Sequence, residues 1–318
     1  MTVAAELPPR LLRVAPSSSA GVRVLAVVSA LSVITLLAAL AGLGLDGRTI
    51  TGAPAWLKPA KFAVSLAVYC ATLAWMLTLV QGRPGLVRGA AWTSAVALAL
   101  ELLLIVVQVV RGTTSHFNVA PGFDAAVFQA MGALVALVFL AAVGTGVLLA
   151  RQRGLPRVLG AGVRGGLAVA VLGMLVAVLM LINRDYSAGG AHTVGGPDGG
   201  PGLPVVGWST EHGDLRIAHF VGLHALQVLP LLAWLLQRYA TRLTDTACLR
   251  LVWLVTAAAS GLVVLLAWQA ERGLPLLHPD APVLTAAACG AALLAAATAY
   301  VLVHGLQPAT VALMVFDP

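Results

Sequence analysis

Charged residues are scarce in this chain. Asp, Glu, Lys and Arg make up 10% of its 318 residues, whereas 60% of the residues are apolar. A soluble globular domain carries about 25% charged residues, so this chain cannot cover a water-exposed surface of its size. The mean hydropathy of +0.96 agrees. The composition excludes a soluble enzyme and a disordered chain, and it predicts an all-α, polytopic membrane helix bundle.

Cysteines and chemical motifs are also few. Cys70, Cys248 and Cys289 lie in or beside apolar runs without Cys-x-x-Cys spacing, which excludes a disulfide-stapled module and indicates neither a redox pair nor a zinc site. The chain has no H-E-x-x-H motif, phosphate-binding glycine loop or G-x-S-x-G motif. Its arginines lie mostly in short loops between apolar runs, a pattern typical of membrane topology and not of nucleic-acid binding.

Eight apolar runs are long enough to cross a membrane, which takes about 20 residues. We predict spans over residues 22–44, 60–80, 89–110, 124–150, 164–183, 216–237, 249–269 and 283–304. They form one transmembrane domain, 22–305, between tails at 1–21 and 306–318. The first run starts late and has no clear small-residue cleavage site, so we interpret it as a span and not as a signal peptide.

The charge balance predicts the orientation. The tails and the loops after the second, fourth and sixth spans sum to +9, whereas the loops after the first, third, fifth and seventh spans sum to −1. Arginine-rich loops stay in the cytoplasm. We therefore expect a cell-membrane protein with both termini in the cytoplasm and most of its polar segments on the external face.

The two halves of the chain share short patterns. A shift of 158 residues places Lys58 on Arg216 and Lys61 on His219, and a shift of 161 places Q-V-V-R-G (108–112) on Q-A-E-R-G (269–273). This pattern favours two four-helix repeats, 22–150 and 164–305, related by an axis along the membrane normal. Apolar helices also align by chance, so the sequence leaves the duplication open.

Three predicted helices carry polar side chains on one face. At about 100° per residue, these faces hold Lys58, Lys61, Ser65, Tyr69 and Thr72 on the second span, Ser94, Glu101 and Gln108 on the third, and Arg216, His219, His224 and Gln227 on the sixth. An ionised group in mid-membrane costs about 2.5–3.5 kcal/mol on insertion scales, so such faces avoid lipid. We therefore predict that they converge on an outward-facing polar pocket.

Some of these residues have two interpretations each. Glu101, the acid in mid-membrane, is either a proton carrier or counter-ion, or a protonated carboxyl that ties helices together. Lys58 and Lys61, the two lysines of the chain, either bind an anionic group or extend toward lipid headgroups.

The histidines and the longest loop also leave alternatives open. A haem or metal centre needs imidazoles from different elements, and the candidates are His116, His219, His224 and His278. These histidines could equally hydrogen-bond loops and helix ends. The Gly- and Pro-rich segment 184–215 is either a lid over the outer mouth, anchored by Trp208, or an ordinary flexible connection.

Three segments carry a resemblance. W-L-K-P-A-K-F (56–62), R-G-T-T-S-H-F-N (111–118) and G-D-L-R-I-A-H-F-V-G-L-H-A-L-Q (213–227) resemble signatures of an uncharacterised family of multi-pass bacterial membrane proteins, which implies no activity. The four-plus-four architecture is also similar to haem A synthase. That family has histidines on the even-numbered helices of both halves, whereas here the second span has none and carries Lys61 where the sixth has His219. The acidic and cysteine motifs of that family's first external loop are missing too, so its catalytic residues are not carried over.

The sequence favours a pocket that binds a small ligand or redox cofactor, with a haem- or quinone-linked oxidoreductase as the sharpest version. Glu101, His219 and His224 are the candidate catalytic residues. Anionic groups such as haem propionates would be held by Lys58, Lys61, Arg111 and Arg216. Further ligand contacts are expected from Tyr69, Gln108, His116, Asn118 and Gln227.

Two other functions remain open. One is a proton-coupled transporter of a small solute, with Glu101 as the coupling group. The other is an accessory subunit whose polar faces are buried against a membrane protein partner. The sequence does not decide whether the protein is an enzyme.

Overall fold

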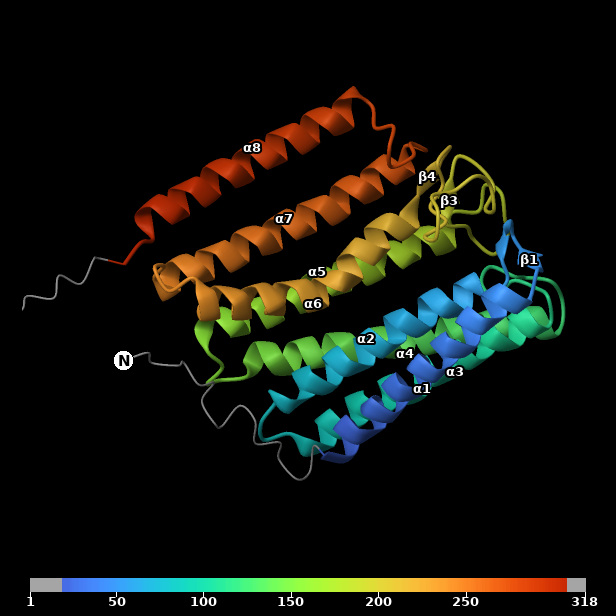
Figure 1. Ribbon diagram of the computed structural model, residues 1–318, viewed down its shortest axis with the longest axis horizontal. Helices are drawn as coiled ribbons and strands as arrows, with labels where there is room; N and C mark the ends of the chain where they lie inside the picture. Colours follow the sequence, from blue (N-terminus) through green and yellow to red (C-terminus); the bar gives the residue numbers. More distant parts are fainter. Residues whose placement is uncertain (1–18, 308–318) are drawn as a thin grey trace, which may run out of the picture.

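The computed structural model describes residues 19–307, which form eight long helices and four very short strands (Figure 1). The helices are α1 Ser19–Leu45, α2 Leu57–Thr78, α3 Pro84–Val110, α4 Phe123–Arg151, α5 Arg157–Ile182, α6 Leu215–Tyr239, α7 Asp245–Glu271 and α8 Ala281–His304. The strands β1 Thr49–Ile50 and β2 Ala53–Pro54 pair antiparallel, as do β3 Thr193–Val194 and β4 Gly213–Asp214. Each helix is long and apolar enough to cross a membrane, which confirms the predicted all-α, eight-span fold.

Several helices begin where the sequence supplies a cap. Asp214 accepts the backbone N–H of Arg216 at the start of α6, and Asp280 accepts that of Val283 at the start of α8. These carboxylates satisfy backbone N–H groups that the first helical turn leaves unpaired. α3 instead begins with Pro84, whose missing N–H costs nothing at that position.

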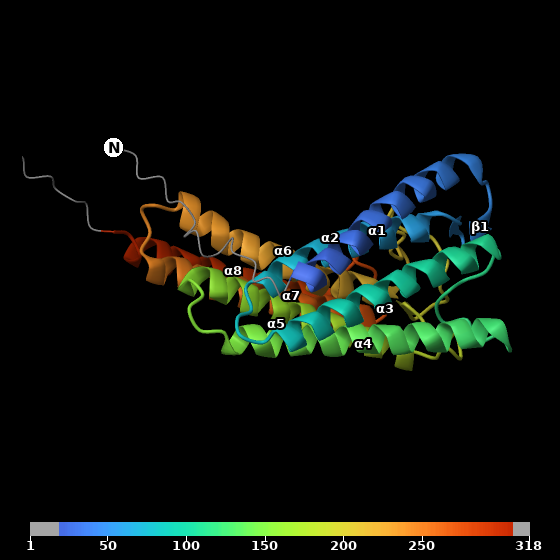
Figure 2. The same cartoon turned by 90° about the horizontal axis from the view of Figure 1, so that it is seen from below.

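The helices pack in the same order in the first half, α1–α4, and the second half, α5–α8. In each half the first helix contacts the second and third, the second contacts the third, and the third contacts the fourth. α4 packs against α5 and joins the halves, and Figure 2 shows α4 and α5 running side by side. This shared order is what an internal duplication predicts, and the duplication itself stays a prediction.

The turns that follow α3 and α7 also correspond in detail. The Gln108 amide donates to the carbonyl of Thr114 (3.4 Å), and the Gln269 amide donates to the carbonyl of Pro275 (2.7 Å), six residues further along in both halves. A glycine with positive φ ends each helix: 76° at Gly112 and 72° at Gly273. Only glycine adopts this left-handed conformation without a steric penalty, so both turns depend on it.

An arginine–aspartate ion pair closes each of these turns. Arg111 pairs with Asp124 in the first turn of α4, and Arg272 pairs with Asp280 at the start of α8. Burial alone would raise the pKa of Asp280, but the hydrogen bond from Arg272 holds that pKa below its usual value. The equivalent pairs support the duplication more strongly than the sequence match alone.

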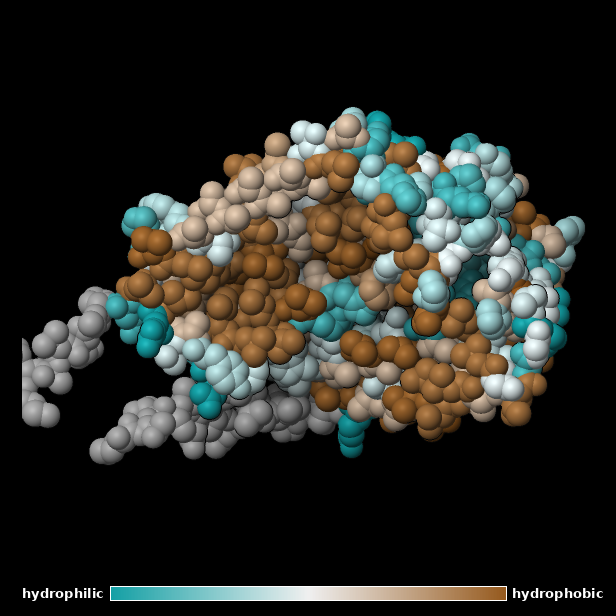
Figure 3. All heavy atoms as spheres, turned by 45° about the horizontal axis from the view of Figure 1, so that its top comes forward, coloured by the Kyte–Doolittle hydropathy of each residue, from teal (hydrophilic) through white to brown (hydrophobic). Residues whose placement is uncertain are grey.

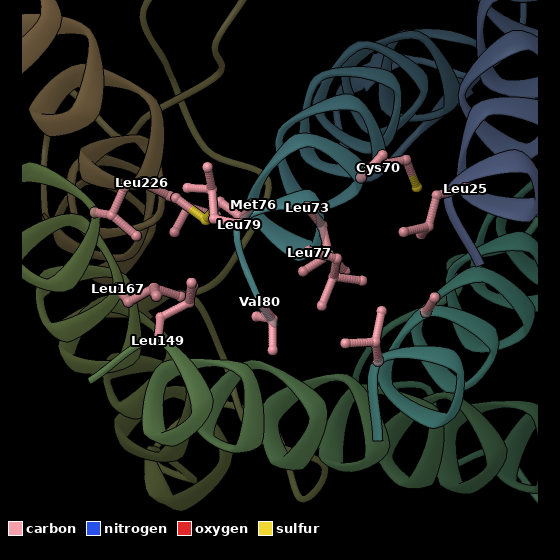
Figure 4. Packing of buried hydrophobic residues seen from close by; sticks show 14 of the residues in the cluster. Leu25, Cys70, Leu73, Met76, Leu77, Leu79, Val80, Leu149, Leu167 and Leu226 are labelled. Carbon is pink, nitrogen blue, oxygen red and sulfur yellow. The ribbon is translucent and has the colours of Figure 1, made fainter. Parts of the chain in front are cut away.

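The largest hydrophobic cluster joins the two halves on one side of the bundle (Figure 4). It combines residues of α1 to α6, among them Met76 of α2, Leu149 of α4, Leu167 of α5 and Leu226 of α6. In contrast, α8 buries only Val283 and Val301 among its residues. Many large apolar side chains are exposed, and Figure 3 shows broad hydrophobic patches on one face of the bundle, as expected for helices in a lipid bilayer.

Both ends of the described chain lie at the same end of the bundle. Gly21, near the start of α1, packs against Arg88 and Ala91, which lie near the start of α3. Gln307, which follows α8, donates its backbone N–H to the carbonyl of Arg242 in the turn between α6 and α7. We call this the inner end and the opposite end the outer end, following the predicted orientation. The outer end carries the 183–214 loop, on the right in Figure 1.

Candidate functional site

The 183–214 loop folds across the outer end and contacts both halves. Gly199 packs directly against the backbone of Thr51 in the β1–β2 turn, and the ring of His192 lies 4.7 Å from the ring of Phe117. On the second half, the ring of Trp208 lies 5.7 Å from that of Phe220 on α6. The loop therefore packs on both halves at the outer end, with Trp208 against α6, and a role as a lid stays a prediction.

A tight turn in this loop accepts hydrogen bonds from side chains of both α2 and α6. The Lys61 ammonium donates to the carbonyl of Val206 (3.0 Å), and the Arg216 guanidinium donates to the next carbonyl, that of Gly207 (2.6 Å). Val205, directly before these carbonyls, has a φ of 65°. This conformation costs a residue with a Cβ about 1–2 kcal/mol. Contacts to two cations from different halves hold the turn in this strained form.

Arg216 is fixed by a buried carboxylate that the sequence analysis did not single out. Asp214 is 1% exposed and accepts two hydrogen bonds from the Arg216 side chain, at 2.9 and 2.6 Å. It also accepts the backbone N–H of Ser209 (2.8 Å), a residue of the covering loop. Asp214 therefore neutralises Arg216 and fastens the loop to the start of α6.

A second aspartate organises the loop around a histidine. Asp198 lies 2.8 Å from Nδ1 of His192 and accepts the backbone N–H groups of His192 and Thr193. Burial lowers the pKa of His192 from its usual value, against the opposing effect of Asp198. Burial alone would raise the pKa of Asp198, but its hydrogen bonds to His192 and Thr193 hold it far below the usual value. Asp198 therefore stays ionised beside a largely neutral imidazole at neutral pH.

Lys58 lies among these groups without a partner. Within residues 19–307 its ammonium makes no hydrogen bond or ion pair, and Nζ lies 6.0 Å from the centre of the Phe62 ring. The charged groups close enough to interact with it electrostatically are Lys61, Glu101, Asp198 and Arg216. These electrostatic interactions link charged residues of α2, α3 and α6, and the outward-facing pocket itself stays a prediction.

Glu101 contributes a buried oxygen to this region. The side chain is 3% exposed, and its Oε1 makes no hydrogen bond with the part of the chain that the structure describes. Ser94 Oγ, two turns away on the same face of α3, is in the same situation. Buried oxygens almost always have a partner, so such an orphan marks a candidate for proton or ligand binding. Lys58 is the charged group close to Glu101.

His116 enters the site from the α3–α4 loop. Its ring lies 5.6 Å from the ring of Phe62, and its Nδ1 lies 3.1 Å from Oγ of Ser115. Burial holds the pKa of His116 well below its usual value, with smaller contributions from Lys58 and from His192 and His219. His116 is therefore neutral at pH 7, and the structure brings three histidines and Lys58 into one neighbourhood.

Three residues that we predicted to contact a ligand make hydrogen bonds or an ion pair in and around the loop that carries His116. The Asn118 amide donates to Oγ1 of Thr113 (3.1 Å) and to the carbonyl of Thr114 (3.2 Å). Gln108 and Arg111 both bind the carboxylate of Asp124. In this structure Gln108, Arg111 and Asn118 therefore position His116 through local contacts.

The ring of His219 is fixed by the neighbouring helix. Its Nδ1 lies 2.7 Å from the carbonyl oxygen of Gly173 on α5, and this acceptor places the ring proton on Nδ1. The contact is close because Gly173 and Gly222 pack backbone to backbone, with no room for a Cβ at either position. Nε2 of His219 makes no hydrogen bond to any described residue and is free to accept a proton or to bind a ligand.

A second polar group lies deeper between α2 and α6. The Gln227 amide donates to Oγ1 of Thr72 (3.3 Å), and the ring of His224 lies 4.2 Å from that of Phe220. The Oε1 of Gln227 is buried and has no partner among residues 19–307. Tyr69 shares this stretch of α2. The polar seam therefore continues from the outer end toward mid-membrane, where Met76 and Leu226 close it.

The four predicted metal ligands are not gathered in one place. His278 is exposed in the loop between α7 and α8, and His224 lies below His219, beside Gln227. Across the described range, no three His, Cys, Asp or Glu side chains form a group that could hold a metal ion. A metal role for these histidines stays a prediction.

Comparisons with known proteins add no family. No protein-family model matches the chain, and no curated protein or solved structure matches it. The resemblance to family signatures and to haem A synthase therefore stays an expectation, and the function is inferred from the site itself.

Sequence reasoning missed several residues of this site. Asp198 and Asp214 were not singled out, and His192 was left outside the candidate set. His192, Asp198 and Asp214 lie in or next to a Gly- and Pro-rich loop, which has no periodicity from which a shared face could be predicted. The one available signal was that two histidines and four acidic residues lie in the segment 184–215 of a chain that has few charged residues elsewhere.

Proposed function

We propose that the protein binds a small anionic ligand at its outer end, between α2 and α6 and beneath the 183–214 loop. The observation that carries this proposal is the position of Lys58. It is an ammonium group without a hydrogen-bond or ion-pair partner among the described residues, and the charged groups around it are Lys61 and Arg216 together with the carboxylates of Asp198 and Glu101. Asp198 is already bound by His192 and Thr193.

The cationic side chains of this neighbourhood differ in how many of their hydrogen-bond donors are already paired. Asp214 neutralises Arg216, and Lys61 is engaged with the carbonyl of Val206. Lys58 has all three N–H donors available to a carboxylate or phosphate. A charge-assisted hydrogen bond of this kind is about twice as strong as a neutral one, and more so away from bulk water. The site is therefore suited to an anion, with Lys58 as its first contact.

Nearby groups could handle a proton of the bound ligand. Glu101 has an unpartnered oxygen close to Lys58, and Nε2 of His219 accepts no described hydrogen bond. The inner part of the seam between the halves is closed by large apolar side chains, including Met76 and Leu167. This closure favours a binding site that opens to one side over a continuous pathway for transport.

The test compares ligand stabilisation in matched variants. The purified protein is screened by thermal shift against simple anions, namely succinate, citrate, inorganic phosphate and pyrophosphate, with chloride as the reference. We expect at least one of them to raise the Tm of the wild-type protein and of the control Arg88→Gln, whose arginine is exposed at the inner end. The same anion should not stabilise Lys58→Gln. No shift with any anion, or an equal shift in Lys58→Gln, would contradict the proposal.

A haem-linked redox function is the second candidate, and His219 favours it. Its Nδ1 is fixed by a backbone carbonyl, which is the arrangement that orients a histidine whose Nε2 binds iron. Lys58 would then hold a propionate, the anionic group of the cofactor. The test is the visible absorption spectrum of protein supplied with haem: a Soret band that is lost in His219→Ala supports the candidate. A wild-type protein without a Soret band ends it.

A further inference from the structure

A separate cavity lies at the inner end, far from Lys58. Its volume is about 110 Å³. It is lined by Val80, Gln81, Arg83, Leu148, Arg151 and Gln152. These residues come from the turn between α2 and α3 and from the end of α4 with the residue that follows. The cavity therefore lies where the first half meets the connection to the second half.

The walls of this cavity are held by hydrogen bonds between segments. Oε1 of Gln152 accepts the backbone N–H of Gln81 (2.9 Å). The guanidinium of Arg164 on α5 donates to the carbonyl of Gln152 (3.1 Å) and to that of Leu149 (3.3 Å). Leu149 is fully buried in the hydrophobic cluster shown in Figure 4. Three segments of the chain therefore fix the shape of the cavity before any ligand is present.

The charges of this cavity are not balanced by the protein. The guanidinium groups of Arg83 and Arg151 make no hydrogen bond or ion pair with any residue between 19 and 307. No acidic side chain lines the cavity. Within the described chain, Asp245 at the start of α7 is the acid of the inner end. Two guanidinium groups thus face a small space with no counter-charge.

From this arrangement we propose that the inner cavity binds a phosphate group. Arginine pairs bind phosphate through several N–H donors at once, and the side-chain amide of Gln81, which also lines the cavity, adds a further donor. Val80 and Leu148 make one wall apolar, which suits a phosphate that carries acyl chains. Basic pockets between transmembrane helices bind anionic phospholipid headgroups in this way. A soluble phosphate offers the same chemistry, so the test distinguishes the two sources.

The test uses the detergent-purified full chain and native mass spectrometry. Phosphatidylglycerol, phosphatidylcholine and inorganic phosphate are added separately to the wild-type protein. The same series is run on the double variant Arg83→Gln/Arg151→Gln and on the control Arg88→Gln/Arg153→Gln. The control arginines belong to the same end of the bundle, are exposed and do not line the cavity. The Tm of each variant without lipid shows whether it is folded.

The expected result is one tightly bound phosphatidylglycerol that phosphatidylcholine does not replace. Each cavity arginine should contribute about fivefold in affinity, so the cavity double variant should lose about 25-fold and the control about twofold or less. Stronger binding of inorganic phosphate than of the lipid, with the same dependence on Arg83 and Arg151, would assign the site to a soluble phosphate. Equal losses in the two double variants, or no bound phosphate compound in any arm, would overturn the proposal.

The phosphate site is also expected to stabilise the junction between the halves. Phosphatidylglycerol should raise the Tm of the wild-type protein and of the control, but not that of the cavity variant. A bound lipid that leaves the Tm unchanged in all three proteins would speak against a site within this junction. Because Lys58 lies at the other end of the bundle, failure of this test leaves the anion site at the outer end untouched, and the reverse also holds.

Discussion

The seam between the two halves has an outer and an inner part of opposite chemistry. In the outer part, Lys61 and Arg216 reach across to one loop, and Glu101 and Gln227 keep buried oxygens without a described partner. In the inner part, apolar side chains of α2, α4, α5 and α6 pack closely, as Figure 4 shows around Leu149 and Leu226. The inner part joins the halves by apolar packing, and the outer part keeps polar groups available to bind a ligand. The difference teaches that stability and binding reside in different parts of the same seam.

The largest effect is expected in the packed part. Leu149→Ala removes a fully buried side chain and should lower the free energy of unfolding by about 3 kcal/mol through lost contacts and a residual cavity. Leu140→Ala, on the same helix but 63% exposed, is the matched control and should change it little. Thermal unfolding in detergent measures both variants. Similar losses in the two would show that the inner seam is not the core of the protein.

The next effect concerns the connection between loop and helix at the outer part. Asp214→Asn leaves Arg216 without its counter-charge in a partly buried site and should cost about 2 kcal/mol. The pair of Asp46 and Arg48 is the more exposed control, with Arg48 49% exposed. Asp46→Asn keeps an oxygen for the Trp56 indole and should lower the Tm much less than Asp214→Asn. If Asp214→Asn is as stable as the wild type, the covering loop is held by something other than this ion pair.

The outer part should also make the protein sensitive to acid. The pKa of His116 is lowered by burial, so the unfolded chain, with a histidine pKa of about 6.5, binds more protons than the folded protein below that pH. Stability should therefore fall as the pH drops below about 6.5, through the range between the two pKa values. Tm measured against pH should show a shallower loss in His116→Gln than in the wild type. His278→Gln, at an exposed position, should keep the wild-type slope.

The smallest effect is expected at the strained turn. Val205→Gly removes the steric penalty of a positive φ, about 1–2 kcal/mol, whereas the greater freedom of glycine in the unfolded chain offsets part of this gain. The net stabilisation should be about 0.5–1 kcal/mol. Val206→Gly, where φ is not positive, should destabilise or leave the Tm unchanged. A lower Tm for Val205→Gly than for Val206→Gly would mean that the turn is not strained.

Most of the fold could be predicted from hydropathy. Each of the eight predicted spans overlaps a helix of the structure, because a backbone in lipid must satisfy its hydrogen bonds within the segment. Helical periodicity also placed Lys58, Glu101 and Arg216 on faces that the structure brings near one another. Periodicity shows which face a residue occupies, and charge then indicates whether that face avoids lipid.

Individual partners could not be predicted in the same way. Arg111 was expected to hold a ligand, whereas the structure pairs it with Asp124, thirteen residues along the chain. The positions of His192 and Asp198 depend on how a long loop folds over both halves, and this follows from tertiary contacts with Thr51 and Phe117. Local sequence carries no signal for such contacts.

The most direct test asks whether Lys58 is free and faces outward. Lys58 and Lys61 are the two lysines of the chain, so a membrane-impermeant amine reagent reports on these two side chains, which peptide mass spectrometry separates. The variant Arg88→Lys adds an exposed lysine at the inner end as an internal control. In right-side-out membrane vesicles, Lys58 should react from the outside without permeabilisation, whereas the lysine at 88 should react only after permeabilisation. A Lys58 that reacts only after permeabilisation would contradict the account.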